Sequence, residues 1–178
     1  NSSYLDCGNP TELKIANEIT YMSWVKTAQW TNVSGIVGRG EGTSGAARAA
    51  SFLMISNSTP GQILWEISDG SVKDVILSNT NLSLNTWNHI AVTWDGTNSS
   101  TSIKIYIDGV LDASGASVIS SINQNISAGE DNKFKIGLRD VIGPGQLYGH
   151  HNGFIDEVSA WNIALSELEI QQYMDCPP

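Results

Sequence analysis

The chain has 178 residues, 40% of them hydrophobic, which is enough for one domain of β-sandwich size with a sizeable core. Its formal net charge of −9 repels phosphate and argues against nucleic-acid binding, and no apolar run is long enough to insert into a membrane. An acidic surface suits calcium or neutral partners, or it simply keeps the protein soluble. Many glycines and only 15% charged residues are typical of an all-β protein rich in turns.

The first half of the chain predicts a series of short strands. Residues 19–27 form the longest of them, and apolar side chains on both of its faces indicate an interior strand. Glycine, proline and asparagine separate the other segments. The expected strands are residues 3–7, 19–27, 35–37, 51–56, 62–68 and 72–77, with an exposed loop at residues 41–48.

Residues 86–112 carry the clearest pattern, an antiparallel meander with one face committed to a core. Ile103, Ile105 and Ile107 alternate with polar side chains, as in a strand that is buried on one face. Asp108-Gly109 follows, the dipeptide most able to adopt the positive φ angles of a type I′ hairpin turn. In the preceding strand, the residues expected on the core face are Ile90, Val92 and Trp94.

The last third predicts two further strands and one helix. Residues 134–138 and 153–161 read as strands, and residues 139–152 read as a loop punctuated by glycine and proline. Ser166 and Glu169 form a capping box, which marks the start of the helix. Short strands followed by a single terminal helix predict an all-β, antiparallel two-sheet sandwich with one short C-terminal helix.

The six tryptophans divide into two groups. Those inside strands are expected in the core or between the sheets: Trp24, Trp87, Trp94 and Trp161. Trp30 ends a strand and Trp65 interrupts one, so either could expose its ring to a sugar. Trp30 is preferred because the segment after it is loop-like.

Two cysteines, Cys7 and Cys176, lie near the two ends of the chain. Sandwich termini often lie close together, so we expect a disulfide, worth about 4–5 kcal/mol in the chain-entropy model. The alternative is two independent buried thiols. A disulfide favours an oxidising setting, and we expect a secreted or cell-surface protein. The sequence has no signal peptide and opens in mid-pattern, so we expect residues 1–178 to be a single module from a longer protein.

Several stretches resemble a known family. They read WNHIAVTWDG, IKIYIDG, FKIGL and GFIDEVSAWNIALSELEIQQYM, and the opening SYLDCGNP and ITYMSWVKT resemble the same family's first two strands. The family is the laminin-G-like, concanavalin A-like jelly-roll domain, in its bacterial, pentraxin-like branch. The ending LSELEIQQYMDCPP is similar to modules of exported Bacteroidetes-type surface proteins.

This resemblance implies two stacked antiparallel sheets in a jelly roll, one of them concave, often with a structural calcium. It also implies a carbohydrate or protein ligand and a non-catalytic module attached to other domains of its parent chain. A fold of this kind hosts many functions, so function has to be argued from sites.

A glycosidase needs two carboxylates across the scissile bond. Related jelly-roll glucanases carry them in an E-x-D-x-E-type run on one strand, and this sequence has no such run. Asp156 and Glu157 are adjacent, so they point to opposite sides of a strand. No G-x-S-x-G elbow is present either. We therefore expect a protein that is not an enzyme.

Asp156 is the metal candidate. In the resembling family, the aspartate of the I-D-E-V strand helps to hold calcium against the N-terminal segment, and residues 1–4 could supply carbonyl oxygens here. This sequence has Ser2-Ser3 where an acidic residue is common, which removes one expected ligand. The alternative is an aspartate hydrogen-bonded to backbone amides.

The 139–152 loop is the recognition candidate. Tyr148 offers a stacking face, while Arg139, Asp140, His150 and Asn152 offer hydrogen bonds to hydroxyls, and Trp30 adds a second platform. A zinc site at the paired histidines is disfavoured, because adjacent side chains point apart and no third ligand lies near them. A solvated loop without a ligand remains the plain alternative.

The sequence thus predicts a non-catalytic, calcium-supported module that binds a glycan. The rival is a protein-adhesion or spacer module with a cell-surface protein as partner and no sugar site. An exposed Trp30–Tyr148 pair near Arg139 would favour sugar, whereas a smooth polar concave face would favour adhesion.

Overall fold

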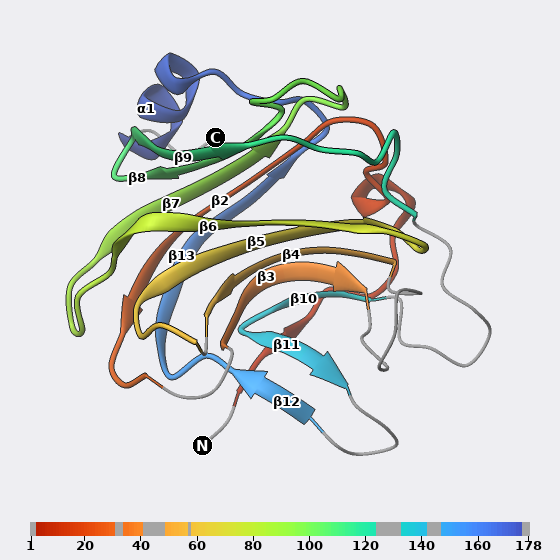
Figure 1. The fold of residues 1–178 in the computed structure, drawn as a ribbon. Helices are drawn as coiled ribbons and strands as arrows, with labels where there is room; N and C mark the ends of the chain where they lie inside the picture. Colours follow the sequence, from red (N-terminus) through yellow and green to blue (C-terminus); the bar gives the residue numbers. More distant parts are fainter. Residues whose placement is uncertain are drawn as a thin grey trace.

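The computed structural model describes residues 3–30, 34–40, 49–56, 58–123, 133–141 and 147–175. They form two large antiparallel sheets, a two-stranded hairpin and one α-helix (Figure 1). In chain order the elements are β1 (Leu5–Asp6), the 3-10 helix η1 (Thr11–Leu13), β2 (Ile19–Thr27), β3 (Ser34–Gly40), β4 (Ala49–Ile55), β5 (Gln62–Asp69), β6 (Lys73–Asn81), β7 (Asn88–Trp94), β8 (Ile103–Ile107), β9 (Val110–Gly115), β10 (Phe134–Ile136), β11 (Leu138–Val141), β12 (Leu147–His150), β13 (Gly153–Trp161) and α1 (Glu167–Asp175).

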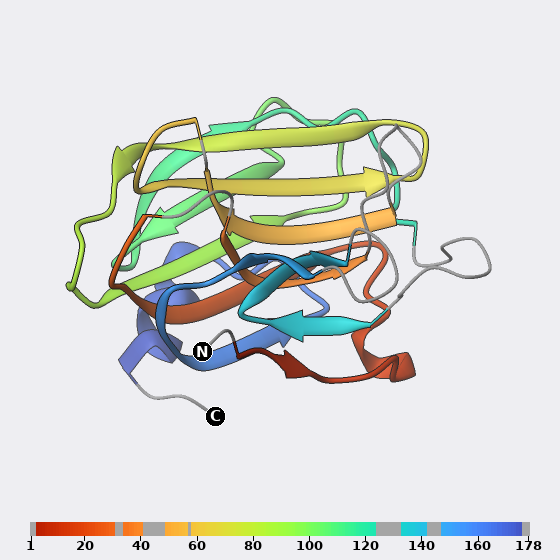
Figure 2. The same ribbon diagram turned by 90° about the horizontal axis from the view of Figure 1, so that it is seen from below.

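The six-stranded sheet has the order β1-β10-β3-β4-β5-β6, and the five-stranded sheet has the order β13-β2-β7-β8-β9. Their inner faces enclose one core, in which the ring of Tyr21 contacts Trp65 and Phe134 edge-to-face at centroid distances of 5.4 and 5.6 Å. β1 and β13 each stand first in the strand order of their sheet and are therefore edge strands. The β11–β12 hairpin lies on the side of the sandwich that these two strands form (Figure 2).

The predicted meander is confirmed. Ile90, Val92 and Trp94 of β7 and Ile103 and Ile105 of β8 are fully buried, as the alternation of apolar residues requires.

The turn after β8 is also confirmed. Asp108 and Gly109 have φ angles of 50° and 78°, the two positive values of a type I′ turn. The Asp108 carboxylate accepts a hydrogen bond from the His89 backbone N–H at 2.8 Å, which ties the turn to β7.

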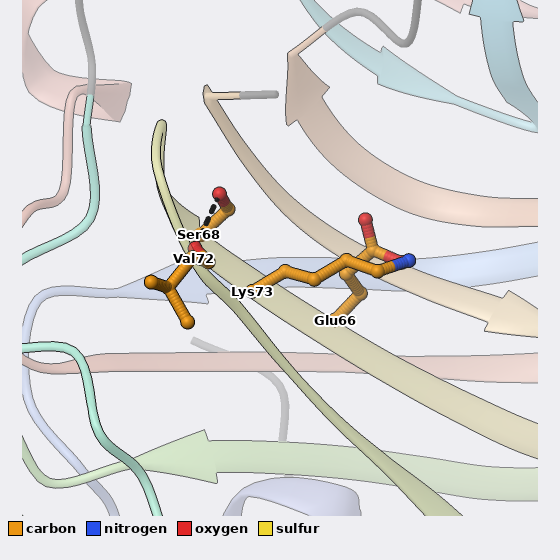
Figure 3. A network of polar contacts seen from close by, with 4 residues as sticks. All are labelled: Glu66, Ser68, Val72 and Lys73. Atoms are coloured by element: carbon orange, nitrogen blue, oxygen red, sulfur yellow. Dashed lines mark hydrogen bonds and ion pairs between the residues drawn. The ribbon is translucent and has the colours of Figure 1, made fainter. Parts of the chain in front are cut away.

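A polar network holds the β5–β6 hairpin (Figure 3). Lys73 Nζ lies 3.4 Å from the carboxylate of Glu66, which is almost fully buried. The Ser68 hydroxyl donates to the Val72 carbonyl at 2.8 Å across the turn. The β5–β6 hairpin is therefore closed by side-chain as well as ladder hydrogen bonds.

Helix α1 packs on the outer face of the five-stranded sheet (Figure 1). Its capping box forms as predicted: Glu169 Oε2 accepts from the Ser166 backbone N–H at 2.7 Å and from its hydroxyl at 2.6 Å. The buried contact joins Ile170 and Leu165 to the sheet residues Met22, Ala91 and Tyr106. The helix covers only part of that face, since residues 153–154 and 156–157 of β13 are exposed.

Some predictions from the sequence are wrong. The predicted loop at residues 139–152 contains strand residues, because β11 and β12 pair in register, Leu138 with His150 and Asp140 with Tyr148. Trp65 is fully buried, whereas Trp87 is 41% exposed. Trp87 precedes β7 rather than lying within it, so the sheet does not bury its ring. The described helices include none that is long and apolar enough to cross a membrane.

Candidate functional site

A groove lies at the side of the sandwich where β1 and β13 are the edge strands. It has a volume of about 590 Å³ and is lined by residues 3–5, 136–137 and 150–155, a set called here the edge groove. Five segments contribute: the N-terminal segment with β1, the end of β10, the end of β12, the bend after it and the start of β13. Elements distant in the sequence thus build one surface.

Two glycines allow this assembly. Gly137 adopts φ +83° between β10 and β11, and its N–H donates to the Ile36 carbonyl at 2.8 Å. A Cβ at Gly153 would lie 2.1 Å from the carbonyl oxygen of Lys26, so only glycine lets β13 start this close to β2. The His151 N–H donates to the Gly137 carbonyl at 2.9 Å and fixes the end of β12 against the turn.

The groove combines aromatic and neutral polar groups. The rings of Tyr4 and His150 lie 6.0 Å apart at an interplanar angle of 57°. Burial lowers the pKa of His151 to about 4, so the imidazole is neutral at pH 7. Asn152 Nδ2 donates to Gln29 Oε1 at 3.3 Å, and the Asn152 side chain is exposed.

An exposed pair of aromatic rings adjoins the groove. Phe154, which lines the groove, is 64% exposed, and its ring centroid lies 6.4 Å from that of Trp87 at an interplanar angle of 48°. This pair is called here the aromatic platform. Sequence reasoning missed it, although one signal was available. Ile155 belongs to the core face of β13, and strand alternation therefore turns Phe154 outward.

The predicted recognition residues are only partly brought together. His150 and Asn152 line the edge groove. Arg139 lies on β11 between Leu138 and Asp140, is half-buried, and its backbone packs closely on Gly35. The backbones of Asp140 and Tyr148 are direct cross-strand partners, while their side chains lie outside the part of the chain that is described.

Trp30 is not the exposed platform that the sequence predicted. Its ring is half-buried and packs against the core, where a Cβ built at Gly61 would come within 3.2 Å of its Cζ2 atom. The ring therefore lies against the core beside Gly61 of the β4–β5 connection.

Asp156 lies on the outer face of β13, opposite Trp24 of β2, and is exposed. Its Oδ1 accepts a hydrogen bond from the Glu157 N–H at 2.9 Å, the backbone bond considered as the alternative to calcium. The N-terminal segment lies beside Ile155, which points the other way. Among the described residues no three His, Cys, Asp or Glu side chains cluster as metal ligands.

A second, smaller cavity of about 190 Å³ lies on the outer face of the five-stranded sheet, at the end of α1. Its lining residues, called here the helix pocket, are Met22, Trp24, His89, Glu157, Val158, Ser159, Tyr173 and Met174.

Cys7 is exposed in the segment after β1. Cys176 falls outside the described residues, so the predicted disulfide stays a prediction.

Comparison with known protein families identifies the family of this chain. The model of the concanavalin A-like lectin/glucanases superfamily, a laminin G type, matches residues 1–171. The chain belongs to this family. The membership confirms the predicted laminin-G-like, jelly-roll architecture. A comparison with curated proteins finds no match.

Solved structures share the family fold at low identity. The carbohydrate-binding module CBM40 of the Ruminococcus gnavus IT-sialidase, bound to alpha2,3 sialyllactose, is 20% identical with a TM-score of 0.71, covering 90% of this chain and 84% of that one. A putative carbohydrate binding protein from Bacteroides ovatus is 21% identical with a TM-score of 0.70, covering 95% and 44%. A SAP-like pentraxin from Limulus polyphemus is 17% identical with a TM-score of 0.62, covering 91% and 72%. At these identities the likeness establishes the fold.

Proposed function

We propose that this laminin-G-like domain is a non-catalytic carbohydrate-binding module that holds a neutral saccharide in the edge groove and against the aromatic platform. The observation that carries the proposal is the exposed Trp87–Phe154 pair beside a groove of about 590 Å³. An aromatic ring stacks on the apolar face of a sugar, and directional polar groups bind its hydroxyls. Tyr4, His150 and Asn152 supply those polar groups.

The distribution of carboxylates supports a binding role rather than hydrolysis. Both glycosidase mechanisms require two carboxylates about 5–10 Å apart across the sugar. No aspartate or glutamate is among the residues that line the edge groove, and the helix pocket holds Glu157 alone.

The charges support a neutral ligand. No lysine or arginine is among the residues that line the edge groove, and the chain carries a net charge of −9. His151 is neutral at pH 7 because its pKa is about 4. An anionic sugar, such as the sialyllactose bound to the R. gnavus module, would therefore meet no fixed cation among the groups that line this groove.

Export to the cell surface or medium and attachment to other domains of a parent chain are part of this proposal. They fit the rival role, protein adhesion, equally well. If no glycan binds, the exposed aromatic pair becomes a contact for a cell-surface protein, and the adhesion function replaces the sugar function.

A glycan array with calcium and with EDTA tests the proposal, followed by calorimetry with lactose and sialyllactose as a matched neutral and anionic pair. We expect lactose-type or other neutral glycans to bind and sialylation to weaken binding. Phe154→Ala should reduce affinity about tenfold or more, in the range of one to two lost aromatic contacts. Leu168→Ala is the control, since Leu168 of α1 is equally exposed, at 64%. Stronger binding of sialyllactose than of lactose would overturn the neutral preference.

A further inference from the structure

The helix pocket is built at an irregularity of β13. The register of β13 against β2 shifts between Asp156 and Ser159, so that Glu157 and Val158 form a bulge. Glu157 takes φ +50°, a left-handed conformation that is unfavourable for a residue with a side chain. The bulge turns Val158 toward the core and leaves the Glu157 carboxylate exposed at the mouth of the pocket.

His89 forms part of the floor of this pocket. Its side chain is 2% exposed, its ring contacts Trp24 at a centroid distance of 5.4 Å, and its Nδ1 atom is buried. Within the described part of the chain, that nitrogen has no hydrogen-bond partner. A buried imidazole nitrogen without a partner is costly, and it becomes satisfied when a ligand donates a hydrogen bond to it.

The surroundings of His89 are negative. Burial lowers its pKa to about 4, against the opposing effects of Asp108 and Asp175, so the ring is neutral at pH 7 and can accept a hydrogen bond. Asp175 ends α1, whose last turn has no basic residue. The carbonyls at a helix C-terminus carry partial negative charge, which a cation normally offsets. Here Glu157 and Asp175 add to that charge instead of offsetting it.

The walls of the pocket are aromatic and soft. Its lining includes two aromatic residues, Trp24 and Tyr173, and two methionines, Met22 and Met174. The Trp24 indole N–H donates to the Met174 carbonyl at 3.4 Å, which holds the ring beside the helix end. Tryptophan and tyrosine faces attract organic cations. A hard metal ion such as calcium needs six to eight oxygen ligands, which these walls do not offer.

We propose that the helix pocket is a second binding site, distinct from the edge groove, that takes a primary ammonium group such as the free amine of an amino sugar. The ammonium donates to the His89 imidazole and the Glu157 carboxylate, and its carbon skeleton lies against Trp24. A pocket of about 190 Å³ suits one sugar ring rather than an oligosaccharide. A lysine side chain presents the same ammonium chemistry.

The indole N–H signals of two tryptophans separate this site from the edge groove. In the ¹⁵N-labelled protein, the Trp24 signal reports the helix pocket and the Trp87 signal reports the aromatic platform, each assigned with a Trp→Phe variant. Titration with glucosamine at pH 7 and low salt should move the Trp24 signal, with a Kd on the order of 1 mM. N-acetylglucosamine is the matched neutral probe and should shift Trp24 at least tenfold less, whatever it does to Trp87.

Two more probes define the chemistry. Lysine amide distinguishes the source of the ammonium: a shift as large as that with glucosamine assigns the pocket to lysine side chains, and a smaller one assigns it to amino sugars. Tetramethylammonium has the charge but no N–H donor, so it should bind more weakly than glucosamine. Equal binding of tetramethylammonium or N-acetylglucosamine would overturn the proposed hydrogen bond to His89.

Variants complete the test. Glu157→Gln keeps the size of the side chain and should weaken glucosamine binding about tenfold, while Glu12→Gln removes an equal charge from η1 and should leave it unchanged. His89→Gln should weaken binding as well. If glucosamine and lysine amide both leave the Trp24 signal in place, or if Glu157→Gln binds like wild type, the proposal fails. A failure of neutral glycans to move Trp87 would leave this result untouched.

Discussion

The edge groove is lined by the start of β13 and the helix pocket by its middle, and the two sites differ most in charge. The lining of the groove has no charged side chain, whereas the pocket has Glu157 at its mouth and Asp108 and Asp175 within electrostatic range of its histidine. The groove is the larger, at about 590 Å³ against 190 Å³. One sandwich can therefore carry both the neutral edge groove with its aromatic platform and the small, acidic helix pocket around the same core.

The two cavities share one feature, a histidine whose pKa burial lowers to about 4; His89 is fully buried and His151 half-buried. In each the neutral ring is the native form. The comparison therefore concerns what each imidazole faces: the neutral polar groups of the groove, or the acidic and aromatic groups of the pocket.

Acid is expected to have the largest effect on both regions. Because the folded pKa of His89 and His151 lies below the unfolded value of 6.5, the unfolded chain binds more protons between pH 6.5 and 4. The contribution of each neutral imidazole to the unfolding free energy is fully present above pH 6.5. It is lost as the pH falls toward 4, by up to about 3 kcal/mol for each ring. Urea unfolding at pH 7 and at pH 4.5 measures this loss.

His89→Gln and His151→Gln assign the loss of stability to each cavity. Each variant should show a smaller difference in unfolding free energy between the two pH values than wild type. The lowered carboxyl pKa values of Asp6 and Asp69 act below this window, since their usual value is already 3.8. Equal pH dependence in wild type and both variants would contradict the assignment.

Calcium removal tests whether Asp156, which lies in β13 between the two regions, holds a metal after all. If it does, calcium at about 100 times its Kd adds about 3 kcal/mol to the unfolding free energy, and EDTA removes it. Thermal unfolding with calcium and with EDTA measures the difference, and Asp156→Asn should abolish it. Coinciding melting curves would end the calcium hypothesis.

Gly153→Ala should damage the groove and spare the pocket. The new Cβ would meet the Lys26 carbonyl oxygen at 2.1 Å, so the start of β13 has to move away from β2. We expect a loss of about 1–3 kcal/mol in chemical denaturation, as for other overpacked sites. Gly8→Ala is the control, because a Cβ there meets nothing within 4 Å, although its positive φ adds a smaller strain. A loss no larger than that of the control would show that β13 can shift freely.

The sequence predicts the sandwich well because local patterns determine it. Alternation in residues 103–107, the Asp108-Gly109 turn and the Ser166–Glu169 capping box each appear as expected. Strand 19–27 has the predicted bounds, and strand 153–161 does too. In each case neighbouring residues alone decide the conformation.

The sites were harder to predict because they depend on contacts between distant segments. The groove joins residues 3–5 to residues 150–155, and no periodicity reveals that contact. The burial of Trp30 depends on Gly61, and the exposure of Trp87 depends on where β7 begins. The bulge at Glu157 breaks the alternation that the sequence reading assumed, so the helix pocket could not be foreseen.

Glu157→Gly gives the smallest expected effect and the sharpest distinction between the regions. Glycine adopts φ +50° without strain, which stabilises the bulge, and its greater freedom in the unfolded chain offsets part of the gain. We expect the unfolding free energy to rise by up to about 1 kcal/mol in urea titrations. The same change removes the carboxylate of the helix pocket, so glucosamine binding should fall while glycan binding at the edge groove is unchanged. Glu157→Gln, which keeps the strain, should lose ammonium binding without gaining stability. If both variants lose stability, the Glu157 carboxylate stabilises the bulge itself, and its strained backbone is not maintained for a ligand.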